Sequence, residues 1–428
     1  MKKVTMFVWN HFTNDARVMR EGLALSENGH DVNVIAIENK KDPRARAFEK
    51  INERFTVHRV PMYPWLLEVY QNHKKEFLFS VAGVSMIVAP ALFYKSWVLL
   101  SSYFIFLVGG YAVIKDRTLR RHMISFIRGS RMVMKGYSHN ADVYHSHDLN
   151  TLAQGAICAK LRFKPRKLVY DSHEVQTDRT GYKPETAAKV EGFLVKFADE
   201  TIVENHTRAG KHESLYGYYP RTLYNYSELY DIESEEKADL HQRLGLNQDE
   251  KILLYQGGLQ AGRGLELLIE AMEQIDGGTL VFLGEGKLKP ILQNMVKDRG
   301  LEERVKFHPK VPLNELPSYT SNAYLGFQVL QNTCFNHYSA SSNKLFEYIM
   351  AHVPVISNDF PEIEKVVETE KVGLSIDSSR TDEIAQAVNR LLRDEDLRNE
   401  LSDNCRRAKY RYNWTNEKKK LLEIYEGL

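Results

Sequence analysis

The hydrophobic residues follow two kinds of spacing, one typical of strands and one typical of helices, and the two alternate along most of the chain. Short apolar runs such as residues 31–37 (DVNVIAI) fit buried strands. The segments between them place apolar residues among charged ones at helical spacing, as Val18, Leu23 and Leu25 do in the segment 16–27. Strands that alternate with helices predict a parallel sheet covered by helices on both faces.

The predicted strands form two groups. The first group is 4–9, 31–37, 56–60, 142–147, 167–171 and 200–205, and the second is 251–257, 279–284, 305–309, 322–328 and 354–357. An acidic, aromatic and weakly periodic connector, residues 224–240, separates them. We therefore predict two α/β halves with a ligand cleft between them, because ligands of such sheets bind beyond the carboxyl ends of the strands.

One stretch, Phe77 to Lys115, departs from the alternation because it is predominantly apolar and Lys95 is the only charged residue before Lys115. A membrane helix needs about 20 apolar residues, and the two parts on either side of Lys95 nearly provide them. Basic residues lie on both sides of the stretch: His73, Lys74 and Lys75 before it, and Lys115, Arg117, Arg120 and Arg121 after it.

Basic residues favour the cytoplasmic face of a membrane, so a single span would place one cluster on the wrong side. The pattern favours a monotopic hairpin or an in-plane insertion, with cationic side chains extending to the headgroups. Two alternatives remain open. The stretch could form two buried helices of a soluble domain, or a hairpin that crosses the membrane twice.

Composition narrows the class of protein further. A length of 428 residues with 43% hydrophobic residues suggests two or three domains. A net charge of +2 argues against a nucleic-acid binder that works through bulk charge. Three widely separated cysteines form no disulfide or zinc pattern. The start, MKKVTMFVW, fits a first strand better than a secretory signal, so we expect a cytoplasmic chain.

A glycine-rich turn lies in the segment 255–272 (YQGGLQAGRGLELLIEAM), between a predicted strand and a predicted helix. Glycines let a ligand approach the backbone closely, and the N-terminus of the following helix favours an anion such as phosphate. Arg263 adds a cation that can hold two phosphate oxygens. The alternative interpretation is a tight strand-to-helix connection without a ligand. No Gly-Lys-Ser/Thr follows, so the segment is not a Walker loop.

A second candidate segment is 336–357 (NHYSASSNKLFEYIMAHVPVIS), where serines precede a predicted helix over 343–351. Lys344 and Glu347 are three residues apart and so share one helix face. A lysine for phosphate and a carboxylate for sugar hydroxyls is the functional interpretation. A solvated ion pair is the structural alternative.

Further polar residues lie at the ends of predicted strands of the first half. His145, His147 and Asp148 could bind a metal ion, but no cysteine or further spaced ligand supports that hypothesis. Asp171 and Glu174 are candidate acids or bases. Their alternative role is to cap the junction between a strand and a loop.

Several of these segments together resemble retaining GT-B glycosyltransferases of glycosyltransferase family 4. The C-terminal resemblance lies in YQGGLQAGRG, LVFLGEG and KLFEYIMAHVPVISND. A bacterial subgroup is resembled by Asn14 to Arg17 and by GHDVNVIA, ADVYHSHDLNTL and KLVYDSHE. The resemblance implies an α/β GT-B fold, in which two Rossmann-like domains face a central cleft and the N-terminal one carries the hydrophobic helical insert. The implied parts are an acceptor domain 1–228 with the insert at about 77–114, a nucleotide-sugar domain 229–409, and a terminal helix 410–428 that crosses back to the first domain.

The resemblance also implies roles for residues of the second half. Arg263 falls where the family has a lysine that contacts the donor diphosphate, and Gly258 replaces an arginine usual in the family. Glu347 matches the second glutamate of the Glu-x7-Glu motif, which holds the ribose. Ser339 stands where the first glutamate, which contacts the donor sugar, would be. We interpret Lys344 as a charge that compensates for Gly258.

The remaining implied site residues fall into two sets. His173 matches a histidine that faces the donor sugar, so it joins Arg263 and Lys344 as a candidate catalytic residue. The candidate donor-binding residues are Gly257, Gly258, Gly284, Gly286, Ser339, Ser342, Asn343 and Glu347, and the candidate acceptor-side residues are Asn14, Arg17, His147, Asp148 and Glu174.

The implied activity is transfer of a hexose from a nucleotide sugar, UDP-linked by default, with retention at the anomeric carbon. The hydrophobic insert favours a lipid-linked or membrane-proximal glycan acceptor and an anionic membrane surface at the inner face of the cell membrane. We expect no metal, no other cofactor and no nucleic-acid partner. The changes at Gly258 and Ser339 leave two alternatives open. One is a catalytically impaired, nucleotide-sugar-binding scaffold subunit, and the other is a UDP-sugar epimerase of GT-B fold.

Overall fold

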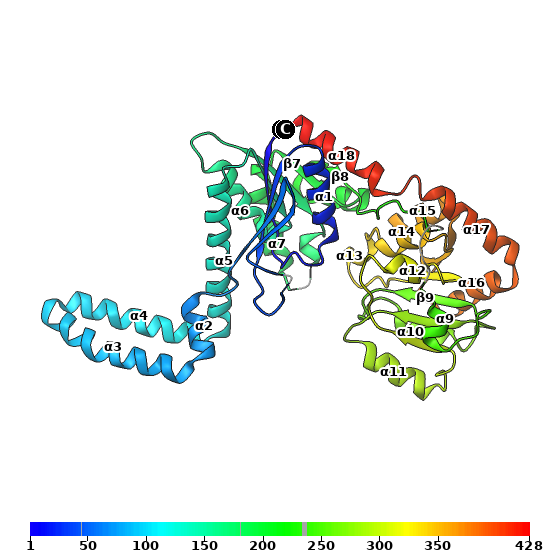
Figure 1. The fold of residues 1–428 in the computed structure, drawn as a ribbon, viewed down its shortest axis with the longest axis horizontal. Coiled ribbons are helices and arrows are strands. Elements are labelled where there is room, and N and C mark those ends of the chain that lie inside the picture. The colour runs from blue at the N-terminus through cyan, green and yellow to red at the C-terminus, as the bar shows by residue number, and fades with distance from the viewer. Residues whose placement is uncertain (44, 180, 233–237) are drawn as a thin grey trace. The chain divides into compact units, whose positions relative to one another are not determined.

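The computed structural model describes residues 1–43, 45–179, 181–232 and 238–428 (Figure 1). Residues 233–237 of the predicted connector lie outside the described residues. The chain divides into two compact units, of which the first comprises Met1–Asp171 and Phe193–Thr201 and the second Ser172–Gly192 and Ile202–Leu428. The predicted domain boundaries, at 228/229 and 409/410, rest on the sequence and stay predictions.

The first sheet has eight strands in the order β3-β4-β2-β1-β5-β6-β7-β8. The strands are β1 (Lys3–Phe7), β2 (Asp31–Ile37), β3 (Phe48–Asn52), β4 (Phe55–Val60), β5 (Val143–His147), β6 (Lys167–Ser172), β7 (Glu200–Val203) and β8 (Arg221–Thr222). The central strand β1 pairs in parallel with β2 and β5, and the edge strand β3 pairs antiparallel with β4. All six strands predicted for this half are present; β3 and β8 were not predicted.

Helices that follow these strands are α1 (Ala16–Glu27), α2 (Trp65–Asn72), α5 (Arg117–His139), α6 (Leu149–Lys160), α7 (Pro184–Leu194) and α8 (His206–Tyr216), with short 3-10 turns at Gln176–Asp178 and Val195–Phe197. The predicted helix 16–27 begins where the Asp15 side chain accepts a hydrogen bond from the backbone N–H of Val18. Helix α5 packs on β1 at Gly136, where an added Cβ would lie 2.4 Å from the Phe7 ring. A glycine is therefore needed for this helix to approach the sheet.

The predicted hydrophobic insert forms two helices, α3 (Lys74–Lys95) and α4 (Trp97–Lys115), joined at Ser96. They lie side by side and antiparallel, and the pair projects away from α2 and α5, which precede and follow it in the chain (Figure 1). Both are long and apolar enough to cross a membrane, and neither contains a buried residue. The alternative of two buried helices of a soluble domain therefore does not hold in this structure.

The second unit contains a six-stranded parallel sheet in the order β11-β10-β9-β12-β13-β14. Its strands are β9 (Ile252–Gln256), β10 (Thr279–Leu283), β11 (Val305–His308), β12 (Leu325–Gln328), β13 (Val355–Asn358) and β14 (Gly373–Ile376). Consecutive residues of β9 face opposite sides, so Leu253 joins one hydrophobic cluster and Leu254 another. The predicted α/β class is confirmed, and β14 is the one strand of this sheet that was not predicted.

The helices around this sheet are α9 (Leu240–Leu244), α10 (Leu265–Ala271), α11 (Lys289–Asp298), α12 (Leu316–Thr320), α13 (Phe335–Tyr338), α14 (Asn343–Met350), α15 (Pro361–Glu370), α16 (Thr381–Arg393), α17 (Glu395–Ala408) and α18 (Trp414–Gly427). In α18 the backbone N–H of Trp414 donates to the Ser227 carbonyl at 2.8 Å. The predicted terminal helix is thus present. Its return to the first domain stays a prediction.

Candidate active site

The glycine turn follows β9 and packs against the turn that follows β10. The backbone N–H of Gly257 donates to the Leu283 carbonyl at 2.9 Å, and Gly257 has a φ of +127°. A Cβ on Gly284 would lie 1.9 Å from the Gly257 oxygen, so the two backbones touch at that point. At Gly258 the nearest atom to an added Cβ is 3.6 Å away. Gly284 is therefore required by packing, and Gly258 is not.

Lys344 is a buried cation beside this turn. Its Cδ lies 3.6 Å from the position of a Cβ on Gly257, and its ammonium group lies 5.5 Å from the centre of the Tyr255 ring. Burial, together with the positive charge of Arg263, lowers the pKa of Lys344 to about 7, although Glu347 raises it. The structure thus brings together Lys344 and Arg263, two residues predicted from segments about 80 positions apart in the sequence.

Glu347 lies one helical turn beyond Lys344 and is held by a residue that the sequence did not single out. The side-chain amide of Gln256 donates to the Glu347 carboxylate at 2.7 Å, and the Thr320 hydroxyl donates to the Gln256 amide oxygen at 2.8 Å. Before the same helix, the Ser342 hydroxyl donates to the side-chain oxygen of Gln328 at 2.8 Å. Asn343 is exposed at the start of α14, and its side-chain oxygen accepts from the Asn225 amide at 3.1 Å.

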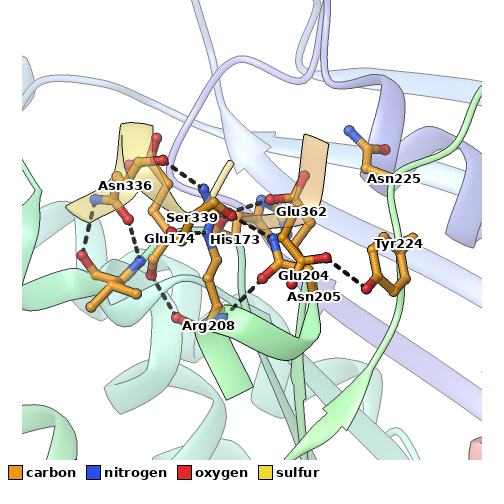
Figure 2. Close-up of polar contacts among 12 residues, drawn as sticks. His173, Glu174, Glu204, Asn205, Arg208, Tyr224, Asn225, Asn336, Ser339 and Glu362 are labelled. Carbon is orange, nitrogen blue, oxygen red and sulfur yellow. Dashed lines mark hydrogen bonds and ion pairs between the residues drawn. The ribbon is translucent and has the colours of Figure 1, made fainter. Parts of the chain in front are cut away.

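Ser339 is completely buried and lies against Arg208 of α8 (Figure 2). The Arg208 Nε–H donates to the Ser339 hydroxyl at 3.2 Å, and the Asn205 side-chain amide donates to the Ser339 carbonyl at 2.8 Å. Ser339 is therefore part of a packed polar network in this unit. Its predicted contact with the donor sugar stays a prediction.

His173 and Glu174 follow β6 and belong to the second compact unit. The guanidinium of Arg208 donates to the His173 carbonyl. Two residues later, the backbone N–H of Val175 donates to the Asn336 side chain at 2.7 Å, and the Asn336 amide donates back to the Val175 carbonyl at 3.1 Å. The His173 segment is thus fixed to the turn that carries Ser339. Figure 2 shows these residues together.

The sequence analysis missed Arg208, Asn205 and Asn336, although one local signal was available. Asn205 is the N-cap of α8, and its side chain accepts from the backbone N–H of Arg208 at 2.9 Å. An Asn followed three residues later by a helical residue is a usual start signal for a helix. That signal places Arg208 in the first turn of α8, but it does not reveal what the guanidinium contacts.

Arg17, a predicted acceptor-side residue, is buried in an ionic network of the first unit. It makes two bonds of 2.9 Å to the two carboxylate oxygens of Asp171 and an ion pair of 3.0 Å with Glu21. Both carboxylates are fully buried, and Arg17 is 6% exposed. Two parallel bonds from one guanidinium fix the orientation of Asp171. Asn14 is exposed, just before α1.

His147 also borders this network, since its Nδ1 lies 3.4 Å from a carboxylate oxygen of Asp171. Its ring stacks on that of His145 with 4.3 Å between centres. Asp148 precedes α6 with a φ of +62°, a strained conformation for a non-glycine residue that is often found at functional sites. The structure therefore brings His147, Asp148 and Arg17 close to the same aspartate.

The donor set for a metal ion is present in this network. Ligand atoms of Glu21, His145, His147 and Asp171 lie within 4.8 Å of one another. However, the guanidinium of Arg17 already supplies the cation for both carboxylates. We interpret the group as an ionic network for this reason, and the expectation of a metal-free enzyme stays a prediction.

The comparisons with known proteins relate the candidate residues between 257 and 347 to a recognised family. Residues 236–408 match the family of Glycosyl transferases group 1. This group 1 domain contains the glycine turn, Lys344, Glu347 and Ser339. It thus confirms that the C-terminal part of the chain is related to glycosyltransferases.

Two curated relatives illustrate the range of the group 1 similarity. The chain is 30% identical over 180 residues to the alpha-D-kanosaminyltransferase of Streptomyces kanamyceticus. This alignment covers 41% of this chain and 45% of the relative. It is 24% identical over 271 residues to a GDP-mannose-dependent phosphatidylinositol monomannoside mannosyltransferase of Mycobacterium tuberculosis. This alignment covers 58% of this chain and 68% of the relative. With the first curated relatives, the chain aligns over about half of their length.

Among solved structures, Anabaena HepE in complex with UDP is similar over the whole of both chains, with a TM-score of 0.69 and 15% identity. Such a likeness shows the fold. The fold is GT-B, as predicted, with two Rossmann-like parallel-sheet domains and an apolar helical insert in the N-terminal region.

Proposed function

We propose that this protein is a retaining glycosyltransferase that moves a hexose from a nucleotide sugar to a lipid-linked or membrane-proximal glycan. The observation that carries this proposal is the buried Lys344 beside Arg263 and the glycine turn. A buried lysine is costly unless an anion accompanies it. A diphosphate is an anion that would keep Lys344 charged and pair with Arg263 at this place.

The two cations fit the chemistry of the leaving group. Breaking the bond between sugar and diphosphate places negative charge on the departing oxygen, and a fixed positive potential lowers the barrier to that step. Arg263 and Lys344 would supply it without reorganisation, because Lys344 is already packed in place. Glu347, oriented by Gln256, would accept hydrogen bonds from the ribose hydroxyls.

Retention at the anomeric carbon needs no nucleophilic carboxylate in this proposal. Ser339 stands where the resembled family has its first glutamate, so this position offers no carboxylate. The bond between the anomeric carbon and the diphosphate oxygen would break while the acceptor hydroxyl oxygen bonds to the same face of that carbon. The hydroxyl proton would pass to the departing diphosphate, and His173 would orient the sugar. Near-normal transfer rates in both Arg263→Ala and His173→Ala would contradict this mechanism.

For the donor nucleotide we propose UDP. The UDP complex of a protein with the same fold supports this choice, whereas one relative is named for GDP-mannose. Binding of GDP but not UDP is therefore the outcome that would change the donor assignment while leaving the reaction class intact.

For the acceptor we propose a glycan carried by a lipid at the inner face of the cell membrane. Helices α3 and α4 expose most of their apolar side chains, including Ile87 at 75% and Ile105 at 72% exposure. Exposed apolar surface of this extent indicates a membrane or protein contact. The basic residues at the base of the hairpin favour an anionic lipid surface. A peripheral or monotopic enzyme of the cytoplasmic face follows from this.

One observation favours a second function, a nucleotide-sugar-binding scaffold subunit without transfer activity. Ser339, in place of the family glutamate, is buried and bonded to Arg208, and Gly258 supplies no side chain to the diphosphate. Tight binding of a nucleotide sugar without its turnover would favour the scaffold. Turnover of a UDP-sugar without any acceptor would instead favour an epimerase.

The first experiment is a thermal-shift series with UDP, GDP, ADP and CMP, and with their common sugar conjugates, on the full chain in mild detergent. A ligand at 100 times its dissociation constant stabilises the folded state by about 2.7 kcal/mol. A shift with one nucleotide would name the donor and justify transfer assays with membrane lipid extracts. If every nucleotide leaves a cooperative melt unchanged, the proposed donor site does not exist.

The proposed contact with the membrane is tested separately, by deleting residues 77–114. The proposal expects a folded protein that no longer sediments with anionic vesicles. A deletion variant that still sediments would remove the support for a membrane-bound acceptor.

A further inference from the structure

Arg208 donates hydrogen bonds to four groups, of which three belong to segments distant in the sequence. Its Nε–H donates to the Ser339 hydroxyl at 3.2 Å, and one terminal nitrogen donates to the Asn336 carbonyl at 3.3 Å. The other terminal nitrogen donates to the carbonyl of His173 and to the carboxylate of Glu204. The side chain of Arg208 is 7% exposed. Most donors of this guanidinium thus have a partner inside the protein (Figure 2).

A buried guanidinium of this kind is both neutralised and fixed. Glu204, four residues before Arg208, forms an ion pair with it and supplies the opposite charge. The planar fork of arginine sets the directions of its N–H groups. The groups that accept from Arg208 therefore have a fixed geometry relative to one another. A lysine keeps the charge but lacks the fork, so it could not hold the same set.

Apart from Glu204, the acceptors of Arg208 come from two candidate functional segments. One is the segment after β6, which carries His173. The other is the turn from α13, which carries Asn336 and Ser339. A second, independent link joins the same two segments, because Asn336 exchanges two hydrogen bonds with the backbone of Val175. The two segments thus form one fixed body in which a shift of either would move the other.

Helix α8, which carries Arg208, is itself held by hydrogen bonds at its first turn. The Glu362 carboxylate accepts hydrogen bonds from the backbone N–H and the hydroxyl of Thr207, at 2.8 and 2.7 Å, and from the Tyr224 hydroxyl at 2.9 Å. Thr207 directly precedes Arg208 in the first turn of α8. The helix that presents the guanidinium is therefore itself fixed in position.

We propose that Arg208 is a positioning residue, which sets the place of His173 relative to the turn of Ser339. The inference rests on the proposed function, since it gives His173 its role at the donor sugar. Ser339 takes part in this support, because its hydroxyl accepts a hydrogen bond from Arg208. The serine at this position thus belongs to the support of His173. A role in direct contact with the sugar is not needed to explain it.

The test compares Arg208→Lys with Ser339→Ala and with Glu213→Gln, an exposed position on the same helix. Hydrogen–deuterium exchange of the full chain in mild detergent reports the backbone mobility of 172–178 and 334–339, with the core strand 252–256 as internal reference. We expect Arg208→Lys to speed exchange in both segments by about tenfold and to leave the reference strand unchanged. Glu213→Gln should match the wild type throughout.

The kinetic test uses UDP-glucose as the probe donor and titration calorimetry with UDP. A positioning residue should affect the rate of the chemical step more than binding. We expect kcat of Arg208→Lys to fall by about tenfold to a hundredfold, while the UDP dissociation constant and the donor KM stay within about threefold. A KM that rises with unchanged kcat would overturn the inference.

The outcomes of the exchange test are independent of catalysis. If Arg208→Lys exchanges at wild-type rates in both segments, Arg208 does not hold them and the inference fails. If Arg208→Lys does not fold, Ser339→Ala removes one acceptor and must still raise exchange in the 172–178 segment. Without any nucleotide binding by the wild type, the proposed function fails instead, and the exchange result still decides whether Arg208 joins the two segments.

Discussion

The Gln256 side chain points its amide group at Glu347, with 2.7 Å between the nitrogen and a carboxylate oxygen. The direction of this amide is fixed, because the Thr320 hydroxyl donates to its oxygen. The last residue of β9 thus orients a carboxylate on α14. A fixed carboxylate is a stronger acceptor for sugar hydroxyls than a neutral amide.

Replacing this carboxylate should weaken nucleotide binding without unfolding the domain. We expect Glu347→Gln to lower the affinity for UDP by about tenfold, because hydrogen bonds to a charged group are stronger than those to a neutral one. Titration calorimetry gives the dissociation constant. Glu364→Gln, an exposed carboxylate of α15, is the matched control and should leave it unchanged. Equal affinities of wild type and Glu347→Gln would refute a role for Glu347 at the ribose.

Lys344 should make UDP binding depend on pH. Its pKa of about 7 in the unoccupied protein means that it loses its proton as pH rises above neutral. A bound diphosphate favours the protonated form, so binding takes up a proton, and affinity should fall by up to about tenfold per pH unit above pH 7. Calorimetry in buffers with different ionisation enthalpies measures this uptake directly.

Two substitutions isolate that effect. Lys344→Met keeps most of the side-chain volume and should bind UDP more weakly at pH 7, with little change in affinity between pH 7 and 9. Lys297→Met, at an exposed position of α11, should retain the full pH dependence of the wild type. A pH dependence that persists in Lys344→Met would show that another group takes up the proton.

His212 should contribute to the loss of stability in mild acid. It is buried between the rings of Tyr216 and Tyr218, with 4.6 and 5.0 Å between ring centres. Burial lowers the pKa of His212 to about 4. The unfolded chain, with an ordinary histidine pKa near 6.5, binds more protons between these two values. The free energy of unfolding should therefore fall as pH drops from about 6.5 towards 4, by at most about 1.4 kcal/mol per pH unit for this group.

The urea midpoint at several pH values between 7.5 and 4.5 tests that expectation. His212→Phe removes the titrating group from an aromatic site, so the urea midpoint of this variant should fall less steeply as the pH is lowered. His122→Phe, an exposed histidine of α5, should not. The idea is wrong if both variants follow the wild-type curve.

The apolar hairpin should determine membrane binding without contributing to folding. Ile105 is 72% exposed on α4, so Ile105→Asp removes little buried area and should leave thermal stability in detergent unchanged. A charged residue inside a bilayer costs about 2.5–3.5 kcal/mol, so partitioning onto anionic vesicles should fall by about a hundredfold. Phe163→Asp, at a fully exposed position after α6, serves as the control. Equal losses in both variants would point to a general effect of charge.

The sequence predicted the elements of this fold because most of its strands are buried on both faces and have clear ends. Residues 31–37 were predicted as a strand to the residue. The edge strand β3, FEKIN, was missed because only one side of it pairs and its residues are exposed or half-buried. Strand β14, GLSI, consists of half-buried residues at the other sheet's edge and lacks the apolar run of the central strands.

The candidate site was predictable where the sequence carries a local pattern. The glycine turn and the Lys344–Glu347 pair are patterns of this kind. Arg208 lies in an ordinary helical segment, and its significance arises from contacts with residues 35 and 131 positions away. No local pattern encodes such contacts. The same holds for Gln256, which had the pattern of a strand residue and no more.

The hairpin of α3 and α4 begins after α2 and returns directly to α5, and its main contacts are with those two helices. The strand order of the sheet does not depend on its presence, since β4 and β5 are placed by other strands. Evolution can therefore lengthen, shorten or replace this hairpin without rebuilding the six-stranded sheet of the second unit. Under the proposed function, the time that the protein stays at a membrane and the rate at which it turns over its substrate could therefore change independently of each other.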